Sequence, residues 1–179
     1  MAYGWEGEKV RLVPLDVEKH IANEILWSND PEVTAWTLRD PPLTRPTQTD
    51  FFERMAAPAV AHPADILFAI ETLEDGRHIG HAGLHQINYR HGVALTGTII
   101  GPAEARGLGY GTDAVAVRTR YAFEVLGLRM LISEVFTENV ASLKALSRAG
   151  YREVARIPRR YWKRGAFRDV VLLVAERES

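Results

Sequence analysis

The stretch Gly101-Pro-Ala-Glu-Ala-Arg-Gly-Leu-Gly-Tyr-Gly-Thr112 is a glycine-rich turn between two segments with different hydrophobic patterns. The residues from Val93 to Ile100 are typical of a strand, and those from Asp113 to Leu126 are typical of a helix. The N–H groups of residues 107–112 should therefore face out of a helix N-terminus, where they lack helical partners and the macrodipole is positive. Glycine also allows close main-chain approach. This pattern predicts a pyrophosphate site.

Two common phosphate-binding loops do not fit the spacing. A P-loop has a lysine and then Ser or Thr after its last glycine, whereas Gly111 is followed by Thr112 and Asp113. A Rossmann pattern that starts at Gly107 meets Thr112 where its third glycine belongs. The pattern that remains is Arg106-x-x-Gly109-x-Gly111.

This hexapeptide resembles the acetyl-CoA pyrophosphate loop of the GNAT superfamily of N-acetyltransferases. The resemblance continues through the helix end Tyr121-Ala-Phe-Glu-Val-Leu-Gly-Leu128, a strand from Arg129 to Phe136, and the segment from Asn139 and Ser142 to Gly150-Tyr151. The turn Gly165-Ala-Phe167-Arg-Asp169 is most similar to the branch of ribosomal-protein N-terminal (Rim-type) acetyltransferases.

The resemblance implies a fold and a set of binding residues. The fold would be a single α/β GNAT-like domain with a mostly antiparallel sheet of about seven strands, a V-shaped splay and flanking helices. Acetyl-CoA would be the acyl donor, with its pantetheine arm along the main chain of Ile99 and Ile100. The other implied donor-binding residues are Arg106, Gly107, Leu108, Gly109, Tyr110, Gly111, Thr112, Asn139 and Ser142.

The chain departs from the family pattern at two catalytic positions. Many relatives carry a tyrosine that protonates the leaving sulfur, and Leu146 aligns with it, so the resemblance leaves Ser142 as the catalytic candidate. A first-turn serine in a helix capped by Asn139 is the structural alternative. Relatives also carry a glutamate base where this chain has Leu95. The base is therefore unassigned, with Glu71, Glu134 and His85 as candidates from neighbouring strands and a water-mediated route equally allowed.

Composition indicates one domain over residues 1–179, since 179 residues that are 46% hydrophobic and 25% charged can build a full core. No window approaches the roughly 18 apolar residues of a membrane span, and the first residues lack a signal-peptide core. We therefore expect a cytoplasmic protein without a membrane partner. The absence of cysteine excludes disulfides and thiolate metal sites.

Basic residues concentrate near the C-terminus. The segment from Arg152 to Arg168 has seven basic residues and one acid, Glu153, with Tyr161 and Trp162 among them. Such a mixture can bind nucleic acid. Because the run is short and the overall net charge is −1, we interpret it instead as a solvated hairpin or the rim of a substrate site.

Three histidines lie close together in the sequence, but their spacing does not favour a metal site. On a strand, His81 and His85 would share a face about 13 Å apart at roughly 3.3 Å per residue, with His78 pointing the other way. One ion could not bridge that distance. We expect no metal and interpret these residues as surface or acceptor-site histidines.

The N-terminal half reads as strands and helices that precede the loop. The pattern predicts a strand from Lys9 to Leu15, a helix capped by Asp16, a helix from Thr47 to Ala57, and two strands, from Asp65 to Leu73 and from Arg77 to Asn88, joined by a turn at Asp75-Gly76. Phe51, Phe52 and Met55 of the second helix are expected in the core rather than in an acceptor site.

These observations favour an acetyl-CoA-dependent N-acetyltransferase acting on a primary amine, either a protein N-terminus or a small molecule such as a polyamine or an antibiotic. The alternative is a CoA-binding regulatory domain with reduced catalysis, motivated by Leu95 and Leu146. The sequence does not identify the acceptor amine, and it does not distinguish a monomer from a homodimer.

Overall fold

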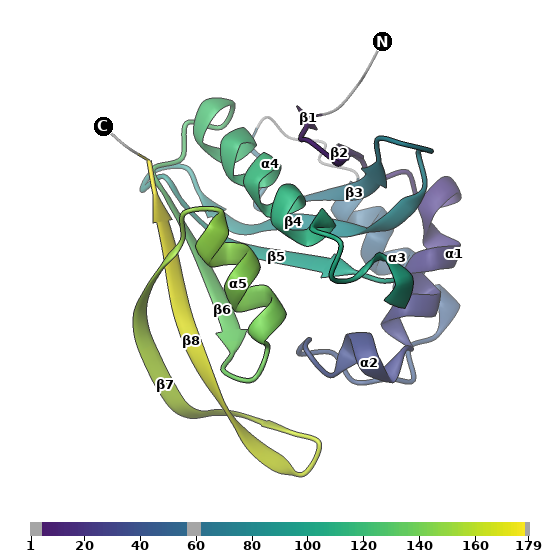
Figure 1. Cartoon of the computed structure of the whole chain (residues 1–179). Coiled ribbons are helices and arrows are strands. Elements are labelled where there is room, and N and C mark those ends of the chain that lie inside the picture. The colour runs from purple at the N-terminus through teal and green to yellow at the C-terminus, as the bar shows by residue number, and fades with distance from the viewer. Residues whose placement is uncertain (1–4, 57–61, 178–179) are drawn as a thin grey trace.

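The structure is a computed structural model and describes residues 5–56 and 62–177. An eight-stranded mixed sheet has the strand order β1-β2-β3-β4-β5-β6-β8-β7 (Figure 1). The strands are β1 (Trp5–Glu6), β2 (Val10–Pro14), β3 (Ile66–Thr72), β4 (His78–Asn88), β5 (Val93–Ile100), β6 (Met130–Phe136), β7 (Arg152–Lys163) and β8 (Ala166–Glu176). The helices are α1 (Val17–Ser28), α2 (Pro31–Thr34), α3 (Arg45–Ala56), α4 (Tyr110–Glu124) and α5 (Val140–Arg148), with a 3₁₀ turn η1 (Ala103–Ala105).

The predicted α/β class and mostly antiparallel sheet are confirmed. Among the strand pairs of the described residues, only β5–β6 is parallel. The sheet has eight strands where about seven were expected, because the two-residue β1 adds to its edge. The predicted strand from Val93 to Ile100 has the bounds of β5.

Helix bounds differ from the sequence pattern at two N-termini. Helix α4 begins at Tyr110 rather than Asp113, because the glycine turn leads directly into the first helical residue. Helix α3 begins at Arg45 rather than Thr47, and its expected end at Ala57 lies outside the described residues. The cap at Asp16 is confirmed, since its carboxylate accepts a hydrogen bond from the Lys19 N–H.

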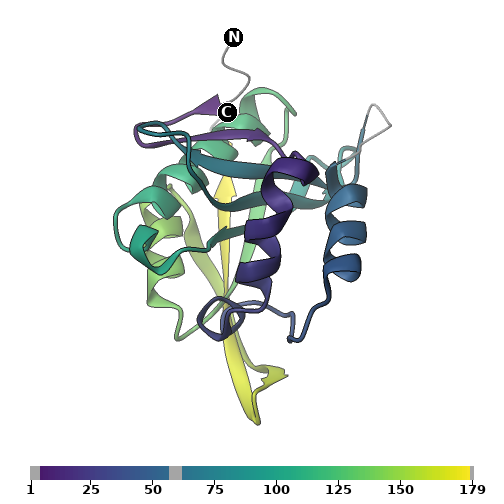
Figure 2. The same cartoon turned by 90° about the vertical axis from the view of Figure 1, so that its right-hand side faces the viewer.

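Helices cover both faces of the sheet. Helices α4 and α5 pack on one face, and α1 and α3 lie on the other (Figure 2). Each face of the sheet has its own hydrophobic core. Successive side chains of β3 point to opposite faces, so Phe68 and Ile70 pack with α4, whereas Leu67 and Ala69 pack with α1 and α3. Phe52 is buried in the core between the sheet and helices α1 and α3, as expected.

The basic segment forms the β7–β8 hairpin, which extends beyond the rest of the sheet (Figure 1). Several of its arginines pair with acids, which offsets much of the local positive charge: Arg156 with Glu153, Arg160 with Glu134 and Arg168 with Glu138. At the hairpin tip, Lys163 Nζ lies 2.6 Å from a carboxylate oxygen of Asp40, and Arg164 donates to the carbonyl of Pro31. The tip is therefore joined to α2 and to the chain that follows it.

In the described part of the chain, no helix combines the length and hydrophobicity that crossing a membrane would require.

Candidate functional site

The glycine-rich turn has the geometry of an anion site. Gly107 and Gly109 have φ values of 78° and 90°, in the left-handed region that favours glycine. Gly109 precedes α4 as its N-cap and offers no side chain to cap it. Within residues 5–56 and 62–177, the N–H groups from Gly107 to Thr112 have no protein acceptor. An anion at this position would supply the acceptors that the protein does not.

The side chain of Arg106 does not point into this turn. Its guanidinium lies 2.8 Å from Glu32 Oε2 and 3.4 Å from Asp30 Oδ2, and it donates to the Gly101 carbonyl at 2.5 Å. These contacts hold the start of the loop against α2. The Arg106 N–H donates to the Ala103 carbonyl at 3.1 Å, so Arg106 supports the loop and does not offer a free donor to a phosphate.

A lysine that the sequence pattern did not reveal lies at the turn. Lys9 Nζ donates to the Leu108 carbonyl at 2.8 Å, and it would lie 3.3 Å from a Cβ added at Gly109. The carboxylate of Asp113, in the first turn of α4, accepts hydrogen bonds from the N–H groups of Glu8, Lys9 and Val10. Asp113 thus fixes the segment that carries the lysine, and a cation stands beside the uncapped helix N-terminus.

The sheet opens next to the turn. Strands β5 and β6 pair only over Val93–Leu95 and Met130–Ile132. A hydrogen bond between the hydroxyl groups of Thr96 and Ser133 follows the last pair, and from there to Ile100 the two strands have no ladder pairing within the described residues. The predicted splay is confirmed. Ile99 and Ile100 lie on its open side, between the apex of the splay and the glycine turn.

A buried arginine occupies the α4 side of this opening. Arg118 is 1% exposed and donates to the Gly97 carbonyl at 2.7 Å and to Thr98 Oγ1 at 2.5 Å, with Tyr151 Oη 3.4 Å away. Its Nε has no partner among the described residues. Arg118 satisfies a strand carbonyl that a paired neighbour would otherwise satisfy, and this stabilises the splayed main chain.

The helix after β6 confirms one expected role. Asn139 caps α5, since its Oδ1 accepts a hydrogen bond from the Ser142 N–H at 3.1 Å. Ser142 is half-buried in the first turn. Leu146 is 3% exposed and belongs to the core between α4 and β6. A tyrosine substituted at position 146 would therefore be attached to a core position and not to the open surface of the site.

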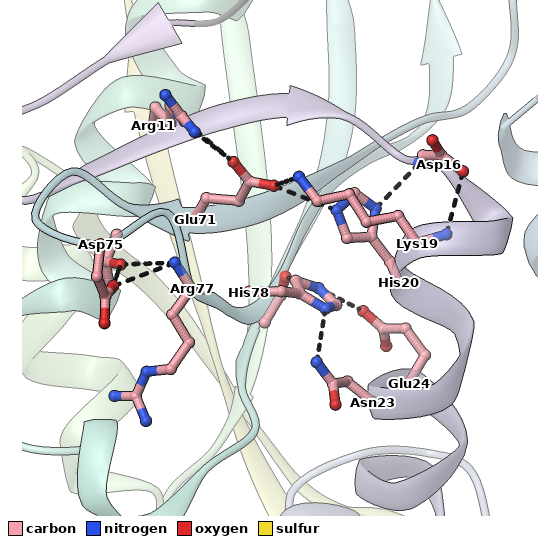
Figure 3. Close-up of polar contacts among 12 residues, drawn as sticks. Arg11, Asp16, Lys19, His20, Asn23, Glu24, Glu71, Asp75, Arg77 and His78 are labelled. Carbon is pink, nitrogen blue, oxygen red and sulfur yellow. Dashed lines mark hydrogen bonds and ion pairs between the residues drawn. The ribbon is translucent and has the colours of Figure 1, made fainter.

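Glu71, one of the three candidate bases, is fully engaged in ion pairs. Its side chain is 1% exposed, contacts Arg11 and Lys19 and lies 3.4 Å from His20 Nε2 (Figure 3). Burial by itself would raise the pKa of Glu71, but hydrogen bonds from Lys19, Arg11 and His20 lower it to about 2. A carboxylate that is so strongly stabilised is a poor proton acceptor.

Glu134, the second candidate, is also engaged. It accepts hydrogen bonds from Arg160 Nε at 3.0 Å and from the Tyr161 hydroxyl at 2.7 Å. Both partners come from β7, so the contact joins the hairpin to β6. This arrangement suits an anchor for the hairpin better than a proton acceptor.

His85, the third candidate, lies across from the position of the missing glutamate. It is the register partner of Leu95 in the β4–β5 pair. Its Nδ1 is 3.2 Å from Asp65 Oδ1, and its side chain is 34% exposed. Burial, followed by the smaller influences of His81 and Arg118, lowers the pKa of His85, although Asp65 acts in the opposite direction.

The expected orientation of His78 is wrong. His78 Nε2 lies 3.4 Å from Glu24 Oε1 (Figure 3). His81 Nδ1 lies 2.8 Å from Glu24 Oε2, so both histidines reach the same carboxylate of α1. The reason is a β-bulge: Gly80 pairs with Ile70 and His78 with Glu71, which leaves Ile79 as an extra residue that resets the alternation. Within the described residues, no His, Cys, Asp or Glu group has the arrangement of a metal site.

The Glu24 cluster is a buried, charged unit. Glu24 is 1% exposed. Burial would raise the pKa of Glu24, whereas the charges and hydrogen bonds of His81 and His78 lower it to about 2. The cluster therefore joins α1 to β4 through a carboxylate that stays ionised at neutral pH.

Comparisons with known proteins agree with this geometry. The family model described as an acetyltransferase (GNAT) domain matches residues 9–152. No curated protein sequence matches the chain. The structure is similar to a spermidine N-acetyltransferase from Vibrio cholerae in complex with CoA and spermine, with a TM-score of 0.83 and 19% identity over 93% of this chain and 95% of that one.

Two further solved structures are similar. Mycobacterium smegmatis RimJ in complex with CoA-disulfide has a TM-score of 0.81 and 22% identity, over 93% of this chain and 81% of that one. A GCN5-related N-acetyltransferase from Brucella melitensis has a TM-score of 0.76 and 25% identity, over 97% and 78%. Because the family model spans most of the sequence, including the glycine turn, the splayed strands and α5, this chain belongs to the GNAT acetyltransferase family.

Proposed function

We propose that this protein is an acetyl-CoA-dependent N-acetyltransferase that moves the acetyl group to a primary amine. The observation that carries the proposal is the uncapped N-terminus of α4 beside the opening between β5 and β6. A long ligand with a phosphorylated end and an extended arm matches that combination. Family membership and the CoA complexes of the similar structures support acetyl-CoA as this ligand.

The glycine turn and the opening between β5 and β6 would bind different parts of the donor. The pyrophosphate would accept hydrogen bonds from the main-chain N–H groups of Gly107, Leu108, Gly109, Tyr110, Gly111 and Thr112, next to the Lys9 ammonium. Arg106 would hold the start of the loop, because its N–H donates to the Ala103 carbonyl and its side chain pairs with α2. The pantetheine arm would pair with the main chain of Ile99 and Ile100 in place of the β6 strand. Asn139 and Ser142 would flank the arm from α5, with Ser142 proposed to face the departing sulfur.

The acceptor class has two sources of support. The spermidine N-acetyltransferase structure holds spermine, and another similar structure is that of a putative ribosomal-protein-serine acetyltransferase from Vibrio cholerae. A small amine and a protein N-terminus are therefore the acceptors to test. Either would attack the thioester carbonyl as a neutral amine and release CoA as a thiol.

A CoA-binding regulatory domain is the second candidate. Two observations favour it: Leu95 stands where relatives have a glutamate base, and Leu146 is buried where relatives have a tyrosine. Such a domain would bind acetyl-CoA but would not release CoA with any amine.

Calorimetry with acetyl-CoA and a thiol-release assay test the proposal. The panel contains spermine, butylamine and a tetrapeptide with a free N-terminal alanine. In Gly109→Asp the new carboxylate would lie near Lys9 Nζ and against the pyrophosphate, so we expect affinity to fall by at least about 100-fold. Gly150→Asp is the matched control, since Gly150 has a φ of 88° and open space around it.

The outcomes separate the candidates. Binding that is lost in Gly109→Asp alone, together with thiol release by the wild type, supports the enzyme. Binding without release on the whole panel favours the regulatory domain. Equal affinity of the folded Gly109→Asp variant and the wild type contradicts the loop assignment.

A further inference from the structure

One face of the β4–β5 pair carries an imidazole at the mouth of the splay. His85 lies opposite Leu95, the last β5 residue that pairs with β6. Beyond Leu95 the main chain of β5 has no ladder pairing with β6 among the described residues, so a ligand arm can lie beside it. A side chain that extends from His85 along the strands therefore arrives where the reacting groups would meet.

Two glycines form the surface on which this imidazole lies. Gly83 and Gly97 are register partners, two residues from His85 and Leu95 respectively. A Cβ added at Gly83 would overlap the His85 ring, and one at Gly97 would lie 3.7 Å from Nε2. The ring thus covers Gly83 and reaches toward Gly97, and only glycine at 83 leaves it this position.

Asp65 holds the imidazole in one orientation. Its Oδ1 is 3.2 Å from His85 Nδ1 and also accepts a hydrogen bond from the Gln86 N–H at 3.3 Å. A carboxylate beside Nδ1 selects the tautomer that has its hydrogen there, so the lone pair is on Nε2, the nitrogen nearest Gly97. The side chains of His85 and Asp65 are 34% and 38% exposed, so an acceptor can reach them.

We propose that His85 is the general base of this acetyltransferase and that Asp65 is its positioning residue. The proposal rests on the proposed N-acetyltransferase function. The amine nitrogen forms a bond to the acetyl carbon, the carbon–sulfur bond breaks, and CoA departs with the electron pair as a thiolate. The proton that the nitrogen loses passes to His85 Nε2 and from there to the thiolate or to water.

The surroundings of the ring keep it in the form that accepts a proton. Burial, the largest influence, lowers the pKa of His85 below the ordinary 6.5, and His81 on the same strand and Arg118 from α4 lower it further. Asp65 opposes these influences and raises the pKa through a hydrogen bond and its charge. His85 is consequently neutral at neutral pH, as a base must be.

Three variants test the proposal with the best acceptor from the amine panel. His85→Gln should lower kcat/KM at pH 7.5 by about 100-fold, the lower end for general-base catalysis. The matched control is His91→Gln, an exposed histidine in the β4–β5 turn, which should keep the wild-type rate. Gly83→Ala should reproduce the loss of rate because its methyl group displaces the His85 ring. All three should keep the acetyl-CoA Kd.

The pH profile distinguishes a base from a structural residue. We expect the wild-type kcat/KM to fall in acid with an apparent pKa equal to that of the His85 ring, which NMR titration of the free protein measures independently. Asp65→Asn removes the group that raises this pKa, so the acid limb should move to lower pH in both measurements.

Two results would overturn the proposal. Wild-type kcat/KM in His85→Gln, with an unchanged acid limb, excludes His85 as the base while leaving the N-acetyltransferase standing. A wild-type protein that binds acetyl-CoA but releases no thiol with any amine overturns the enzyme and its base together.

Discussion

Replacing Glu71 with glutamine tests whether this residue is a structural ion pair or a base. In the folded protein the pKa of Glu71 is lowered from its ordinary 4.5 to about 2. One pH unit of difference corresponds to about 1.36 kcal/mol, so the ionised carboxylate stabilises the fold by about 3 kcal/mol at neutral pH. The Glu71 side chain is 1% exposed, whereas Arg11 and Lys19 remain in contact with water. Glu71→Gln should therefore lower the free energy of unfolding by about 3 kcal/mol, at the lower end for breaking a buried pair.

The pH dependence has a definite sign. Because the folded-state pKa is below the unfolded-state value, the stabilisation is complete above about pH 5 and is lost as the pH falls toward 2. Urea unfolding at pH 7 and at pH 3 measures it. The difference between wild type and Glu71→Gln should shrink from about 3 kcal/mol to about 1 kcal/mol.

A neighbouring glutamate provides the control. Glu74 is exposed in the turn after β3, so Glu74→Gln should change stability by less than about 0.5 kcal/mol. A Glu71→Gln effect that is the same at pH 7 and pH 3 would refute the ion-pair argument. A variant that loses turnover and the acid limb of its rate profile, at unchanged stability, would return Glu71 to the candidate bases.

Three further predictions concern the donor site. Lys9→Gln should weaken acetyl-CoA binding by about 5-fold in calorimetry at low salt and by less at high salt, since an exposed charge is screened; a salt-independent loss would contradict this. Asp113→Ala leaves three N–H groups without their carboxylate acceptor and should lower the free energy of unfolding by about 3 kcal/mol in urea, whereas a loss below about 1 kcal/mol would mean that water replaces the carboxylate. Ser142→Ala should reduce kcat by up to about 100-fold with little change in acetyl-CoA Kd if the hydroxyl stabilises the thiolate; unchanged turnover leaves only its place in the α5 cap.

The loop and the elements next to it were predictable because their signals are local. The glycines at 107 and 109 have the positive φ values that the turn requires, and β5 ends where the apolar run ends. The position of Asn139 before a short amphipathic segment likewise fixes a cap within three residues. Such features depend on residues that are close in the sequence, so the sequence pattern is sufficient to predict them.

The parts that were not predictable depend on pairing between distant strands. The bulge at Ile79 turns His78 toward Glu24. The alternation of side chains along β4 alone cannot predict this bulge, because it arises from the pairing of β4 with β3. Lys9 reaches the loop because Asp113 binds the main-chain N–H groups around it and Leu73 binds its carbonyl, and both partners are distant in the sequence. The relation of His85 to Leu95 required the β4–β5 register, and that of Arg118 to Gly97 required the packing of α4 on β5.

The capture of Glu8, Lys9 and Val10 by Asp113 has a consequence for the order of folding. These hydrogen bonds join residues 103 to 105 positions apart in the chain, and closing a loop of that length has an entropic penalty of about 4 kcal/mol. During synthesis β3 can pair with β2 and the Leu73 N–H can bind the Lys9 carbonyl, but the N–H groups of Glu8, Lys9 and Val10 lack their carboxylate acceptor until Asp113 has left the ribosome. The lysine beside the donor loop therefore reaches its place only after more than half of the protein has been made, and the donor site matures late in folding.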